Sequence, residues 1–298
     1  MIAAVLLLLP VTGAAGWLLF WQASHRSDEF AAIRTTPLWN GLLSDSRSIT
    51  LVVGDYYIFG ENTDNAGANR LVREYSINSP NDLDNYLMEH PALAGRYMDL
   101  DLYYLPVSAA AALKSIMPIL APNAAARDRI HVIQASELTP DMIKRTNIVY
   151  IGYLSGLGLL REAVFAGSRF SVGSTYDELI DNEGKHSYVS QEGGPDDPDR
   201  KLKDFGYFST FTGPGGNRIM IIAGTRDIGV MQTAESVTSQ DSVGLLTGQS
   251  GNSKAYEALY EVEGIKRSNL SGRLLMVSPL HADKIWNSQP AALQFPNG

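Results

Sequence analysis

The chain begins with an uncharged apolar run. Residues 2–21 contain no Asp, Glu, Lys or Arg. A helix rises about 1.5 Å per residue, so a helix of this length spans the hydrocarbon core of a bilayer, which is about 30 Å thick. Trp17 and Trp21 stand near its far end, where aromatic rings favour the membrane interface. The pattern predicts a transmembrane anchor over residues 1–22.

A cleaved signal peptide is the alternative for this segment. Such a peptide begins with basic residues and turns polar after a cleavage site made of small residues. Here no basic residue precedes the apolar run, and the run continues through 17–21 after the small residues at 14–16. The pattern therefore favours an uncleaved anchor.

The flanking charges bear on the orientation of this anchor. Arg26 and Arg34 follow the apolar run, and the positive-inside rule assigns such a flank to the cytoplasm. Asp28 and Glu29 dilute that signal, and a cytoplasmic segment upstream of Met1 would also account for the missing basic flank. We expect a single-pass membrane protein, with the periplasm slightly favoured for its soluble domain and the cytoplasm as the alternative.

Further along, three runs of branched apolar residues are typical of strands buried on both faces. They span 48–53, 147–151 and 218–223, and a shorter run at 130–133 predicts a fourth strand. Capping and periodicity signals predict helices between and after them, near 79–89, 108–120, 157–165 and 228–237. This alternation predicts an α/β fold with a largely parallel sheet and helices on both faces.

The remaining segments complete the predicted organisation. Residues 23–47 are expected to form a juxtamembrane linker with a short helix, and 48–298 a single soluble α/β domain. Within that domain, 256–266 and 273–277 predict an antiparallel strand pair near the C-terminus. The Gly- and Ser-rich stretch at 244–253 is expected to be a flexible turn region.

Composition narrows the possible chemistry. Hydrophobic residues make up 45% of the chain and charged residues 19%, which is typical of a folded domain. The absence of cysteine excludes disulfides, Cys-ligated metals and thiol catalysis. A net charge of -8 argues against general affinity for nucleic acid, and the five histidines lack metal-ligand spacing. We predict no cofactor, no metal and no nucleic-acid contact.

The ends of the three apolar strands carry the candidate site. Ligands of open α/β sheets bind beyond the carboxyl ends of the strands, at a topological switch point. Glycine lets the backbone approach a ligand there, and arginine can hold a carboxylate or phosphate. We expect a cleft for a small polar or anionic molecule, lined by Asp55, Tyr56, Tyr153, Ser155, Gly156, Thr225, Arg226 and Asp227. The alternative is ordinary loop and helix-capping chemistry, which uses the same residue types.

Three functions remain open on the sequence. The favoured one is a membrane-anchored binding or sensing module, because donors and glycines converge without a credible nucleophile–base pair. The second is a hydrolase or transferase in which Asp55 and Asp227 hold a divalent ion. The third is an interaction scaffold that binds a protein partner and no small ligand.

Three segments carry a family resemblance: LVVGDYYIFGE at 51–61, NIVYIGYLSGLGLL at 147–160 and IAGTRDI at 222–228. With them, most of 48–278 resembles the C-terminal portion of bacterial proteins that have an N-terminal winged-helix domain and one transmembrane helix. The winged helix itself is absent from this sequence. The resemblance implies a sensing or partner-binding domain of such a regulator, and it implies no catalytic residues.

Overall fold

The computed structural model describes residues 28–64, 67–74, 76–173, 175, 177–191, 200–251 and 253–286. The predicted anchor at 1–22 lies outside this part of the chain. Within it, no helix combines the length and the apolar character needed to cross a membrane.

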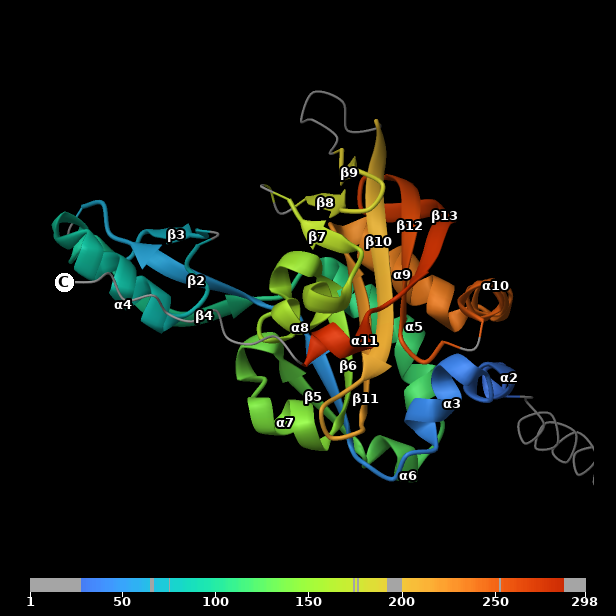
Figure 1. Cartoon of the computed structure of the whole chain (residues 1–298). Helices are drawn as coiled ribbons and strands as arrows, with labels where there is room; N and C mark the ends of the chain where they lie inside the picture. The colour runs from blue at the N-terminus through green and yellow to red at the C-terminus, as the bar shows by residue number, and fades with distance from the viewer. Residues whose placement is uncertain are drawn as a thin grey trace, which may run out of the picture.

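A seven-stranded mixed sheet forms the centre of the fold (Figure 1). In spatial order its strands are β13 (Ser268–Pro279), β12 (Tyr256–Ile265), β10 (Lys201–Thr212), β11 (Arg218–Gly224), β6 (Asn147–Tyr153), β1 (Ile49–Val53) and β5 (Ile130–Gln134). The strands β11, β6, β1 and β5 run parallel, whereas β10, β12 and β13 join antiparallel. The parallel sheet is confirmed for four strands, and the predicted C-terminal pair extends the same sheet.

Successive residues of the parallel strands point to opposite faces, and each face carries its own core. Leu51, Val149 and Ile222 pack toward one face, which is covered by α2 (Ala31–Arg34), α3 (Pro37–Leu43), α5 (Val107–Leu120), α9 (Asp227–Thr238) and α10 (Gln240–Ser250). Val52 and Tyr150 pack toward the other, which is covered by α7 (Pro140–Arg145), α8 (Leu160–Gly167) and α11 (Ala282–Ile285). The expected helices on both faces are therefore confirmed.

The segment expected to be a juxtamembrane linker contributes to this core. Trp39 of α3 is fully buried, and its indole N–H donates to the carbonyl oxygen of Val237 at 2.7 Å. Ile33, Leu38 and Leu42 lie in the same core. The folded body therefore begins before residue 48, because α2 and α3 cover the end of α9.

A second correction concerns residues 244–253, which were expected to be a flexible turn. Most of this stretch belongs to α10. Gly244 and Gly248 weaken its helix propensity, but Val243 and Leu246 are fully buried against the α9 face of the sheet. Burial of these two side chains outweighs the weak local preference.

A small antiparallel sheet projects away from the body as an arm (Figure 1). It consists of β3 (Arg70–Val72), β2 (Tyr56–Glu61) and β4 (Tyr97–Tyr104), with α4 (Pro80–Glu89) and η1 (Pro91–Leu93) between its strands. Tyr57, Phe59, Ile77 and Leu83 form its core. Because only two residues separate β2 from β1, the arm continues directly from a central strand.

The remaining elements lie around the ends of the sheet. A three-stranded sheet of β7 (Phe170–Val172), β8 (Glu178–Asp181) and β9 (His186–Val189) precedes β10. The short helices are α6 (Ala124–Arg127), η2 (Ala135–Glu137) and η3 (Leu154–Gly156).

Candidate functional site

The three predicted loops converge at one edge of the sheet. Because β1, β6 and β11 are adjacent and parallel, their carboxyl ends lie side by side, with Val53 opposite Ile151 and Gly224 opposite Tyr153. The antiparallel strand β10 begins at the same edge, and α9 starts there. The chain leaves β1 toward α5 on one face and β6 toward α8 on the other, so β1 and β6 form a topological switch point.

Side chains fill the space at this switch point. The hydroxyls of Tyr56 and Ser155 hydrogen bond to each other at 2.6 Å. A Cβ atom on Gly156 would lie 3.0 Å from the hydroxyl of Tyr150, and one on Gly54 only 2.4 Å from it. The glycines therefore allow strands and side chains to pack closely here.

Asp55 is occupied by a contact with the neighbouring η2 helix. Its carboxylate accepts hydrogen bonds from the backbone N–H of Ser136 at 3.0 Å and from the Ser136 hydroxyl at 2.6 Å. The Asp55 side chain is buried. This pair joins the end of β1 to the residues that follow β5.

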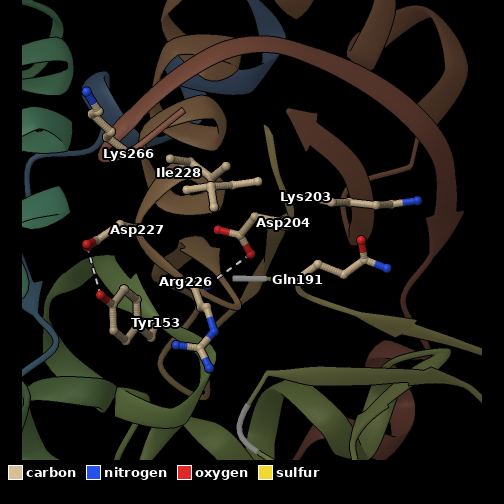
Figure 2. Close-up of a pocket in the computed structure, with 9 residues that line it drawn as sticks. Tyr153, Gln191, Lys203, Asp204, Arg226, Asp227, Ile228 and Lys266 are labelled. Carbon is tan, nitrogen blue, oxygen red and sulfur yellow. Dashed lines mark hydrogen bonds between the residues drawn. The ribbon is translucent and has the colours of Figure 1, made fainter. Parts of the chain in front are cut away.

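A hollow opens at the other end of the edge, beside the start of α9 (Figure 2). We call it the α9 hollow, and its volume is about 110 Å³. Its walls are formed by Tyr153, Gln191, Leu202, Lys203, Asp204, Arg226, Asp227, Ile228 and Lys266. Three of the eight predicted site residues, Tyr153, Arg226 and Asp227, thus line one hollow.

Asp227 joins the starts of two helices. Its carboxylate accepts a hydrogen bond from the Tyr153 hydroxyl at 2.7 Å, and one from the backbone N–H of Ser108 in the first turn of α5 at 3.3 Å. Burial, together with the nearby Asp227 charge, raises the pKa of the Tyr153 phenol far above its usual range. Tyr153 therefore stays protonated and acts as a hydrogen-bond donor.

Asp204 is one of six residues of this hollow that the sequence did not reveal, together with Gln191, Leu202, Lys203, Ile228 and Lys266. Its buried carboxylate accepts hydrogen bonds from three backbone N–H groups and two hydroxyls. These donors belong to Phe205, Arg226, Gly229, Ser190 and Thr225. The carboxylate thereby fixes the start of α9 against β10. Burial raises the pKa of Asp204, while its hydrogen bonds act in the opposite direction.

The remaining predicted residues and the cations have defined contacts. The Thr225 hydroxyl donates to Asp204 at 2.5 Å and does not line the hollow. The Arg226 guanidinium pairs with Asp177, just before β8, at 2.9 Å. Lys203 pairs with Glu261 of β12 at 2.5 Å. Arg226 and Lys203 are therefore tied to neighbouring segments.

The two aspartates of the alternative enzyme hydrogen bond to different partners. Asp55 is held by Ser136, and Asp227 by Tyr153 and Ser108. In the part of the chain that the structure describes, no group of three His, Asp or Glu side chains is arranged to hold a metal ion.

Comparison with protein-family models, curated proteins and solved structures finds no match to this chain. The resemblance to winged-helix regulators therefore stays an expectation, and the case for function rests on the geometry of the site.

Proposed function

We propose that this chain is a binding or sensing module, tethered to a membrane by its N-terminal segment, that binds a small anionic group in the α9 hollow. The observation that carries the proposal is that Arg226, Lys203 and Lys266 all contribute to the lining of one hollow at the carboxyl edge of the sheet. This is the edge at which α/β sheets bind their ligands.

The charges around the hollow favour an anion. Three cationic side chains line it against two carboxylates, Asp204 and Asp227. Five donors satisfy Asp204, and two satisfy Asp227. The starts of α5 and α9 add the partial positive charge of two helix N-termini.

The size of the hollow limits the ligand. Pockets that enclose a drug-sized ligand have volumes of about 300–1,000 Å³. The α9 hollow is smaller, at about 110 Å³. It therefore accommodates a phosphate, a sulfate or a short carboxylate, and it excludes the base and sugar of a nucleotide.

Titration of the full-length chain with inorganic phosphate, sulfate and short dicarboxylates tests this proposal. A ligand that binds only the native state stabilises it by about 2.7 kcal/mol at a concentration of 100 Kd. We expect a rise in the melting temperature with at least one of these anions. Isothermal titration should then show single-site binding, and Arg226→Ala should abolish both signals.

Two matched variants separate the hollow from its surroundings. Asp177→Asn removes the ion pair of Arg226 but keeps its guanidinium, so it should retain binding. Lys201 lies two residues before Lys203 on β10 and outside the hollow, so Lys201→Ala should bind normally and Lys203→Ala weakly. Absence of a shift with every small anion, or equal binding by Arg226→Ala, would overturn the proposal.

A further inference from the structure

The strand β5 forms an edge of the central sheet that lacks the usual protection. No strand in the described part of the chain pairs with its outer side. Edge strands are normally protected by Lys, Pro, a bulge or a covering element. Residues 130–134 are Ile-His-Val-Ile-Gln, with no charged residue or proline, and Val132 is 57% exposed. This edge can therefore accept another strand.

The arm and β5 together form a concave corner. A hollow of about 510 Å³ is lined by Asp101, Leu102 and Tyr103 of the arm and by Gln134, Ser136 and Glu137 at the end of β5. We call this hollow the β5 corner. Leu100, Leu102 and Tyr104 on β4 are exposed apolar side chains beside it. A chain that pairs with β5 would therefore also contact the arm.

The charges along this edge are complementary to themselves. Arg127 is exposed five residues before Val132, and Glu137 is exposed five residues after it. Arg129 between them turns inward and donates to the carbonyl oxygen of Arg47 at 2.7 Å. Arg127 ends α6 and Glu137 lies in η2, so these two residues flank β5 at opposite ends. Antiparallel pairing of two β5 strands about Val132 therefore brings the Arg127 end of each strand beside the acidic β5 corner of the other copy.

We infer that β5 is the interface of a two-fold symmetric dimer, in which the β5 strands of two copies pair antiparallel about Val132. Two-fold dimers bring the same patch of both subunits together, as this edge requires. Val132 faces Val132 of the partner subunit, and His131 faces Ile133 of the partner subunit. Arg127 of the partner subunit enters the β5 corner, between Asp101 and Glu137.

The pairing also explains what covers the exposed apolar side chains. A five-residue strand pair alone buries less than the roughly 1,200 Å² typical of a stable interface. Contacts between the arm of each copy and the body of the other supply the remaining area, through Leu100, Leu102 and Tyr104. A second copy is thus the occupant that matches both the shape and the charges.

Because the chain contains no cysteine, a single introduced cysteine tests this strand pairing directly. In antiparallel strands, directly opposed Cα atoms lie about 4.5–5.5 Å apart, within the range that a disulfide bridges. Full-length Val132→Cys, oxidised in membranes or detergent, should form a covalent dimer on a non-reducing gel. Leu245→Cys is the control, because Leu245 is 60% exposed on α10, which packs near the opposite edge of the sheet.

Charge exchange tests the register independently. Arg127→Glu and Glu137→Arg should each lower the dimer fraction measured by light scattering, and the double variant should restore it. Recovery in the double variant would assign the effect to the pair of Arg127 and Glu137, because the neighbouring Asp128 carries the opposite charge and is left unchanged. Unchanged melting temperatures would show that the single variants still fold.

Either of two results would overturn the inference. One is a monomeric full-length chain in which Val132→Cys forms no more covalent dimer than Leu245→Cys. The other is a dimer that is unaffected by Val132→Lys, which would place the interface elsewhere. In the first case, crosslinking of Val132→Cys only to a different protein would identify β5 as a docking strand for that protein.

Discussion

At the scale of single residues, two buried carboxylates hold together segments that are distant in the sequence. Asp204 fixes the start of α9, as described above. Glu257 on β12 is fully buried and accepts hydrogen bonds from the hydroxyls of Ser168, Tyr207 and Ser278 and from the backbone N–H of Arg169. Burial raises the pKa of Glu257, although its hydrogen bonds act in the opposite direction.

The raised pKa of Glu257 predicts a pH-dependent stability. A carboxyl group with a higher pKa in the folded state binds more protons there than in the unfolded state. Its contribution to stability is therefore fully present below 4.5, the pKa in the unfolded state, and is lost as the pH rises through the pKa of the folded state. Between about pH 4 and about pH 8, the unfolding free energy of wild type minus that of Glu257→Gln should fall. The fall should be about 1.4 kcal/mol per unit of pKa elevation.

Urea denaturation of both proteins across this pH range measures the difference. Other titrating groups cancel between the two proteins, so the subtraction isolates Glu257. A difference that stays constant or grows with pH would contradict the raised pKa.

At the scale of secondary structure elements, α9 lies so close to β10 that Gly229 is required. A Cβ atom at this position would lie 2.3 Å from the carbonyl oxygen of Phe205, and backbone cannot yield as a flexible side chain does. Gly244 on α10 offers the contrast, because no atom lies within 4 Å of its Cβ position.

We therefore expect the same substitution to have opposite effects in the two helices. Gly229→Ala should lower the unfolding free energy by about 1–3 kcal/mol through overpacking. Gly244→Ala should raise it by about 0.5–1 kcal/mol, because alanine has the better helix propensity. Thermal or chemical unfolding measures the change in unfolding free energy of each variant. Equal changes would show that α9 does not pack on β10 in this way.

Sequence patterns predicted the strands whose residues are almost all buried and the helices that begin with a clear capping signal. The strands β1, β6 and β11 are apolar runs, and a capping serine or threonine followed by proline marks the starts of α4 and α7. Residues 201–212, which form β10, carry polar and small residues among the aromatic ones, so no clear strand signal was available.

The site was predictable only in part, for a related reason. Strand ends indicated Tyr153, Arg226 and Asp227, because residues after parallel strands share one edge. Asp204 and Lys203 reach the same hollow from an antiparallel strand, and only the order of strands in the sheet reveals that. The filled switch point depends on side-chain packing of Tyr56 and Tyr150, which no local pattern encodes.

At the scale of the whole molecule, the body and the predicted anchor are close in sequence. The first core residue of α2, Ile33, lies about a dozen residues beyond the end of the apolar run. At no more than about 3.6 Å per residue, this stretch would keep the body of an anchored chain within a short reach of the bilayer surface. In Figure 1 the arm and α2 lie on opposite sides of the body, so the arm of an anchored chain would extend away from the anchor.

The tether itself gives a prediction for the full chain. Because residues 2–21 are uncharged, the chain should remain in the membrane fraction after alkaline carbonate extraction. Deletion of 2–21 should release it, with an unchanged melting temperature, because the described core begins at Ile33. Release of the intact chain by carbonate would exclude a transmembrane anchor.

The ion pair between Arg226 and Asp177 links the α9 hollow to the sheet of β7, β8 and β9. If the α9 hollow binds an anion as proposed, that anion would compete with Asp177 for the same guanidinium, so occupancy of the hollow and attachment of this sheet would oppose each other. Thermodynamic linkage makes such competition reciprocal. A macromolecule that binds the β7–β9 sheet and separates it from Arg226 would therefore strengthen anion binding. A bound anion would in turn strengthen the binding of that macromolecule.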